Sequence, residues 1–138
     1  MELNASVIIE ACRAGAEEAA RLAPFLYDLD GWDGADCDTG SNGAATMAAL
    51  EAAMDSLDPR AQLRDALEAA VETIIRRGLG HSGMALGAIF EAWAGALGDE
   101  PHVTPLALRR MLAASLTPVA SSIEWSDALV EMLGGAVR

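Results

Sequence analysis

Apolar residues recur along this chain with the 3.6-residue period of amphipathic helices, and glycine and proline divide the pattern into about six segments. No segment shows the strict apolar–polar alternation that is typical of a half-buried strand. The helices are expected over about residues 4–27, 42–56, 59–77, 82–97, 105–116 and 121–137. The pattern therefore predicts an all-α fold.

Within the third segment the apolar residues form one clear stripe, and Asp58-Pro59 at its start has the chemistry of a helix N-cap followed by the first helical residue. The stripe consists of Leu63, Leu67, Val71, Ile74 and Ile75. The first segment carries Val7, Ala11, Ala14, Leu22 and Leu26 near one face, and the second carries Met47, Leu50 and Met54. We expect these faces to form the core.

Composition supports a helical protein and excludes several kinds of partner. The chain is 52% hydrophobic but only 4% aromatic, which favours close-packed helices. Its net charge is −12, with nine arginines and no lysine, which disfavours nucleic acid and anionic membranes as partners. Cys12 and Cys37 are too few for a disulfide framework, and neither a signal peptide nor a membrane span is indicated. We expect one cytoplasmic domain over residues 1–138.

Five aspartates fall within residues 28–42, between the first two expected helices. Carboxylates this dense repel one another unless a cation lies among them, and Mg²⁺ and Ca²⁺ prefer oxygen ligands. One residue separates Asp36 from Asp38, so in an extended loop their carboxylates can face the same side. Asp30 could reach back toward them. An EF-hand is excluded because Ala49 stands where that loop needs glutamate. The loop predicts a metal site, with an acidic surface loop as the alternative.

Two helix starts are candidates for binding phosphate. The aspartate loop enters the next helix through residues 39–42, and free N–H groups at a helix N-terminus attract anions. Residues 78–83 form a glycine-rich turn before another helix, where the Ser82 hydroxyl could donate to a phosphate. This turn is neither a nucleophile elbow nor a Walker A loop, because Met84 replaces the required glycine and no Gly-Lys-Ser/Thr occurs. A C-cap followed by an N-cap explains it about as well.

Together the two motifs resemble the nucleotide-binding L domain of the dihydroxyacetone kinase family, a DhaL-like domain also found in bacterial fatty acid kinases. Residues 36–42, Asp-Cys-Asp-Thr-Gly-Ser-Asn, are similar to the family's Gly-Asp-Gly-Asp-Thr-Gly-Thr-Asn loop. Asp30 stands where the family places its first metal ligand, and Asp33 is a possible substitute for it. Residues 80–83, Gly-His-Ser-Gly, resemble the family's Gly-Asn-Ser-Gly segment. Cys37 and Gly43 depart from the family pattern, which has a small residue and methionine there.

The resemblance implies a shortened form of the family's eight-helix antiparallel barrel, with a nucleotide bound at one end. Asp30, Asp36 and Asp38 would hold Mg²⁺, as a pair of ions that bridge the phosphates of ATP or ADP. The resemblance assigns no catalytic side chain. The residues that it assigns to nucleotide binding are Thr39, Gly40, Ser41, Asn42, Gly80, His81, Ser82 and Gly83.

The implied function is that of the phosphoryl-donor subunit of a dihydroxyacetone-kinase-like phosphotransferase, with a K-type or other subunit presenting the acceptor. The alternative is a non-catalytic, shortened relative that acts as a regulatory or protein-interaction module, because about six helices fall short of the family's eight. Retention of all three aspartates favours the first hypothesis, and the short bundle favours the second. An incomplete bundle leaves apolar surface for a partner to cover, so a homodimer is expected in either case.

Overall fold

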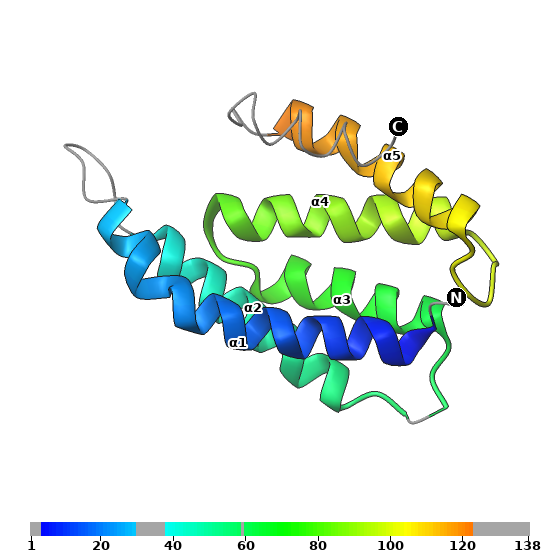
Figure 1. Ribbon diagram of the computed structural model, residues 1–138, viewed down its shortest axis with the longest axis horizontal. Helices are drawn as coiled ribbons and strands as arrows, with labels where there is room; N and C mark the ends of the chain where they lie inside the picture. The colour runs from blue at the N-terminus through cyan, green and yellow to red at the C-terminus, as the bar shows by residue number, and fades with distance from the viewer. Residues whose placement is uncertain (1–3, 30–37, 59, 123–138) are drawn as a thin grey trace.

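The computed structural model describes residues 4–29, 38–58 and 60–122, and these residues form five helices and no strand. The helices are α1 (Ala5–Leu29), α2 (Thr39–Asp55), α3 (Leu63–Arg77), α4 (Gly80–Leu97) and α5 (Pro105–Ser122). Successive helices run in opposite directions, so α2 and α4 begin at the end of the bundle where α1 and α3 finish (Figure 1). The predicted all-α antiparallel bundle is confirmed.

Helices that are neighbours in the sequence are also neighbours in the bundle. Each helix packs against the next one, and additional contacts join α2 to α4 and α1 to α3. Within the described ranges, α5 packs against α4 and against no other helix. These five helices therefore form an open bundle with α1 along one edge and α5 along the other (Figure 1).

Short-range hydrogen bonds determine where two of the helices begin. The backbone N–H of Gln62 donates to the carboxylate of Asp65 over 2.7 Å, which is half of a capping box at the start of α3. The hydroxyl of Thr104 accepts a hydrogen bond from the backbone N–H of Ala107 over 3.1 Å. Such bonds satisfy backbone N–H groups that have no acceptor within the helix.

All five helices contribute to the core, and small residues let these helices approach closely. Ala66 and Ala70 of α3 and Ala107 of α5 are completely buried. Phe90 and Trp93 of α4 meet edge to face with ring centroids 5.5 Å apart. The larger side chains of the core are Leu50, Met54, Leu63, Leu67, Leu97, Val103 and Met111. An alanine-rich, aromatic-poor composition thus produces closely packed helices, as expected.

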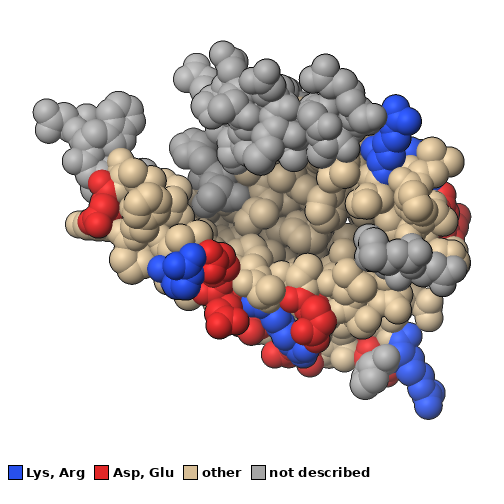
Figure 2. All heavy atoms as spheres, in the orientation of Figure 1, with Lys and Arg blue, Asp and Glu red and all other residues tan. Residues whose placement is uncertain are grey.

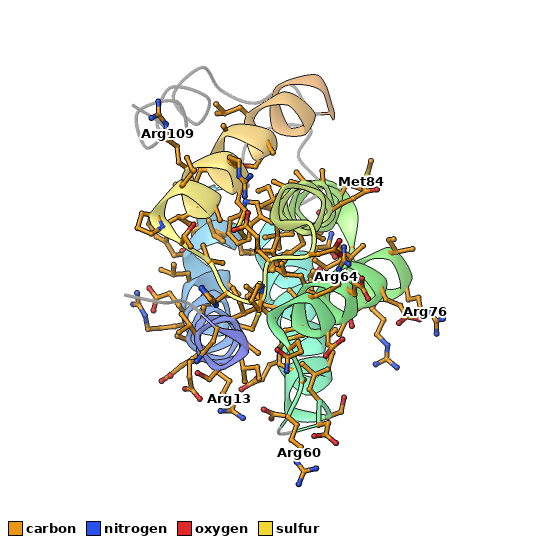
Figure 3. All side chains as sticks on the ribbon, turned by 90° about the vertical axis from the view of Figure 1, so that its right-hand side faces the viewer. Arg13, Arg60, Arg64, Arg76, Met84 and Arg109 are labelled. Carbon is orange, nitrogen blue, oxygen red and sulfur yellow. The ribbon has the colours of Figure 1, made fainter. Side chains whose placement is uncertain are left out.

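Charged side chains lie on the outside of the bundle. Figure 2 shows acidic and basic side chains along the edge formed by α1. Arg13 of α1 bonds to Asp55 of α2, with 2.7 Å between Nη2 and Oδ1, and this bond raises the pKa of the guanidinium. Arg60, Arg76 and Arg109 extend away from the helices (Figure 3). Exposed pairs of this kind add little to stability.

The structure corrects two helix boundaries. The third helix begins at Leu63 and not at Asp58-Pro59, because Asp58 instead forms a turn in which its carboxylate accepts the backbone N–H of Arg60 over 2.7 Å. The fifth helix continues to Ser122, so Ser121 lies inside α5 and does not start a new helix. The rest of the predicted sixth helix lies outside the described residues.

The predicted buried faces are only partly right. Leu63, Leu67 and Ile74 are buried as expected, but Ile75 is 76% exposed, and Ala70 is buried although it was not predicted. On α1 the predicted face was wrong for Val7, Ala11 and Ala14, which are exposed. The buried residues of α1 are Ala5, Cys12 and Ala16. Alanine occurs on several sides of this helix, so the apolar period alone does not select one.

Among the residues described, no helix combines the length and the hydrophobicity that crossing a membrane requires.

Candidate functional site

The first half of the candidate site is the start of α2, which lies against α1. Gly40 is buried, and a Cβ added to it would overlap the backbone carbonyl oxygen of Ala23 and lie 3.1 Å from the Cβ of Leu26. Only a residue without a side chain fits there, so Gly40 brings the first turn of α2 onto the backbone of α1. The position of the predicted phosphate-binding segment is therefore set by α1.

Asp38 stands directly before α2, at the N-cap position. Its backbone carbonyl accepts the N–H of Asn42 over 2.8 Å and the hydroxyl of Ser41 over 2.9 Å. Its carboxylate makes no hydrogen bond to the N-terminal turn of the helix, and the residue is half-buried. The Asp38 carboxylate is thus not used to cap α2, which suits a residue predicted to hold a cation.

The second half of the site is the turn between α3 and α4. Gly78 closes α3 with a hydrogen bond from its N–H to the carbonyl of Ile74 over 2.7 Å. Leu79 then runs extended, and Gly80 opens α4 with a φ of 61°, which side chains other than glycine rarely adopt. A Cβ on Gly83 would come within 2.8 Å of the carbonyl carbon of Gly78, so the first turn of α4 packs on the end of α3.

The two halves meet. A Cβ on Gly80 would lie 2.8 Å from Nδ2 of Asn42, so the side-chain amide of α2 packs directly on the glycine that opens α4. One turn further along α2, the Thr46 hydroxyl accepts a hydrogen bond from the backbone N–H of Leu79 over 3.1 Å. The motifs that the sequence places in separate segments are therefore adjacent at one end of the bundle.

This arrangement brings the N-termini of two helices to the same place. The first N–H groups of α2 and of α4 have no acceptor inside their own helices, and each helix dipole is positive at this end. Two such ends side by side attract an anion more strongly than one. The carboxylate of Asp38, one turn before Asn42, could hold a cation beside such an anion. The combination suits a metal-bound phosphate chain.

The predicted site residues are only partly placed by the structure. Asp38, Thr39, Gly40, Ser41 and Asn42 begin α2, and Gly80 and Gly83 lie in the first turn of α4. His81 and Ser82 belong to that same turn through their backbone. Asp30 and Asp36, like the substitute ligand Asp33, lie outside the described residues. In the described part of the chain, no three His, Cys, Asp or Glu side chains gather as a metal-binding group.

Two grooves lie outside the residues of this site, and the first of them reaches the last residues of α3. One, of about 400 Å³, runs between α2 and α3 and is lined by alanines together with Arg76 and Arg77. The other, of about 460 Å³, lies beside the N-terminal part of α1 and includes Arg13 and Asp55. Neither contains a residue that the sequence motifs select.

Sequence inspection missed Thr46, which is 1% exposed and joins the two halves. The sequence does hold a signal for it. Thr46 stands four residues before Leu50 and eight before Met54, which places its hydroxyl on the buried face of α2. A hydroxyl in such a position needs a partner in the fold. The contact of Gly40 with Ala23 was also not predicted, because nothing local in the sequence pairs these two positions.

The fold and the site define an α-helical domain in which two helix N-termini lie side by side, one of them preceded by Asp38. A family profile described as the DAK2 domain matches residues 34–124, which is more than half of the chain. The chain therefore belongs to the DAK2 domain family, the L-type domain of dihydroxyacetone kinases, as its motifs predicted. Comparison with curated proteins and with solved structures gave no match.

Proposed function

We propose that this chain binds a Mg²⁺–nucleotide where α2 and α4 begin, and that it acts as the phosphoryl-donor subunit of a dihydroxyacetone-kinase-like phosphotransferase. The contact between Asn42 and Gly80 carries this proposal, because it joins the two helix N-termini into one anion-attracting end. Membership of the DAK2 domain family supports nucleotide as the ligand.

Each part of the site has a role that its chemistry suits. Backbone N–H groups of Gly40 and Ser41 in α2, and of Gly80 to Ser82 in α4, would donate to phosphate oxygens. The absence of a side chain at Gly80 lets Asn42 pack on the start of α4, which keeps the two helix N-termini together. Asp38, together with Asp30 and Asp36, would hold Mg²⁺, which neutralises phosphate charge when bound. No covalent intermediate with the protein is required, because positioning and charge stabilisation suffice for phosphoryl transfer.

A separate acceptor-carrying subunit fits the surface around this end. Several large apolar side chains near it are exposed, and such clusters are typical of protein contacts. They are Phe25, Tyr27 and Leu29 at the end of α1, Leu79 in the turn, and Met84 on α4. Met84 points away from the bundle (Figure 3). A partner that presents the acceptor would cover them, and the homodimer stays a prediction.

Thermal unfolding with and without Mg²⁺–ADP or Mg²⁺–ATP tests the nucleotide site. A ligand at about a hundred times its dissociation constant adds roughly 2.7 kcal/mol, which is a shift of several degrees. The shift should disappear with EDTA and in Asp36→Asn and Asp38→Asn. Asp28→Asn is the matched control, because Asp28 lies on α1 and the same charge is removed. Absence of any Mg²⁺-dependent shift in the wild type would overturn the proposal.

A further inference from the structure

Thr46 is a hydroxyl residue in the core of α2. It is 1% exposed and shares the buried face of the helix with Leu50 and Met54. A hydroxyl that is removed from water without a hydrogen bond costs free energy, so such a residue needs a partner. This partner lies outside its own helix: the Thr46 Oγ1 accepts the backbone N–H of Leu79 over 3.1 Å.

Leu79 is the residue from which α4 starts. Its N–H is held by Thr46, and its carbonyl accepts the N–H of Gly83 over 3.0 Å. The two bonds fix the peptide groups on either side of Leu79, and thereby the direction in which the first turn of α4 leaves the turn. Gly83 also lies close to this hydroxyl, since a Cβ on it would be 3.4 Å from Oγ1 of Thr46.

Consequently α2 holds the start of α4 at two points, one turn apart. Asn42 packs its amide on Gly80, and Thr46 bonds to Leu79. Of these two residues, only Asn42 was predicted from the sequence as a candidate for phosphate contact. Thr46 is buried and bonds to the same turn from the core of the bundle, so it acts on the site without contacting a ligand.

We propose that Thr46 is a positioning residue for phosphate binding. It holds the first N–H groups of α4 at a fixed distance from those of α2. The inference rests on the proposed nucleotide function. Hydrogen bonds from a helix N-terminus to phosphate are effective over about 2.7–3.2 Å, so a small displacement of α4 relative to α2 weakens them. A hydroxyl that serves stability alone would leave ligand affinity unchanged when it is removed.

The test compares Thr46→Val, which keeps the shape and removes the acceptor, with Thr46→Ser, which restores the acceptor. Ser115→Ala is the control, because Ser115 is a second buried hydroxyl residue, and its Oγ donates to the carbonyl of Leu112 within α5. Affinity for Mg²⁺–ADP is measured by calorimetry, and stability by urea unfolding. We expect Thr46→Val to weaken binding about tenfold or more and Thr46→Ser to remain within about threefold of wild type. Ser115→Ala should lose stability but no affinity.

The outcomes separate this inference from the function on which it rests. If the wild type does not bind Mg²⁺–ADP, the proposed function fails and the inference fails with it. If the wild type binds and Thr46→Val binds equally well, the inference alone is wrong and the hydroxyl is structural. If Thr46→Val does not fold, amide exchange of the wild type decides: Mg²⁺–ADP should slow exchange at Leu79, and unchanged exchange would overturn the positioning role.

Discussion

Gly40, the second residue of α2, packs against the backbone carbonyl of Ala23 in α1, where a Cβ would overlap the carbonyl oxygen. The obstructing atom belongs to a helix backbone, so it cannot rotate away as a side chain would. Leu26, one turn later in α1, closes the same contact. The close approach fixes where α2 begins and, with it, where Asp38 stands.

Gly40→Ala should therefore destabilise the protein by about 1–3 kcal/mol, because α1 and α2 must separate to admit the methyl group. Gly43→Ala provides the matched control in the same helix, since nothing lies within 4 Å of a Cβ at that position. That substitution should be neutral or stabilise by up to about 1 kcal/mol, because alanine restricts the unfolded chain. Urea unfolding of both variants measures the difference, and equal stability would contradict the α1–α2 contact.

Gly80→Ala should reduce both stability and nucleotide affinity. A non-glycine residue at a φ of 61° costs roughly 1–2 kcal/mol, and the methyl group would also press on Nδ2 of Asn42. A double-mutant cycle with Asn42→Ala isolates the second effect, and we expect a coupling free energy of about 0.5 kcal/mol or more. Additive effects within error would show that the two residues are not in contact.

The control for backbone strain is Gly98→Ala at the opposite end of α4. Gly98 has the same φ of 61°, but no atom lies within 4 Å of a Cβ there. This variant should lose stability while its affinity for Mg²⁺–ADP, measured by calorimetry, stays that of the wild type. A comparable loss of affinity in Gly98→Ala would mean that lower stability, and not the site, explains the effect of Gly80→Ala.

The sequence predicted the elements better than the contacts between them. Periodicity and glycine located α2, α3 and α4 to within a few residues, because these signals act over single turns. Asn42 and Gly80 were both identified as candidates for phosphate contact from their local motifs. The contact between these two residues could not be predicted in this way. It depends on how the ends of α2 and α4 pack, and no nearby sequence pattern indicates it.

The errors have physical causes as well. Asp58-Pro59 has the composition of a helix start, yet Asp58 caps a turn, and the capping pair of Gln62 and Asp65 places the start later. Ile75 was assigned to the core because it stands four residues after Val71 in the apolar stripe. In the structure Ala70 and Ile74, which are four residues apart, lie in the core, and Ile75 lies on the exposed side of α3.

Leu67 and Ile75 offer a direct test of which face of α3 is buried. Leu67 is fully buried and Ile75 is 76% exposed. Leu67→Ala should destabilise by about 2–5 kcal/mol, because it leaves a cavity in the core. Ile75→Ala should change the free energy of unfolding by no more than about 0.5 kcal/mol. Urea unfolding of the two variants checks this, and a large loss for Ile75→Ala would restore the face that periodicity predicted.

Cys12 should make stability depend on pH in the alkaline range. Its side chain is 2% exposed, and burial raises the pKa of the thiol above its ordinary value of 9.0. Well below pH 9.0 both the folded and the unfolded chain keep the proton, so the thiol has no effect on stability there. As the pH rises past this value the unfolded chain loses its proton first, and the free energy of unfolding falls.

Urea unfolding at about pH 8 and about pH 10 measures this effect, with Cys37→Ser in every variant so that one thiol remains. The loss of stability between the two pH values should be larger with Cys12 than with Cys12→Ala, which has no thiol at this position. A thiol reagent provides an independent check, because a buried thiol reacts only when the fold opens. Labelling of Cys12 in the native protein at the rate of an exposed thiol, or an equal alkaline loss in Cys12→Ala, would show that α1 does not bury this residue against α2.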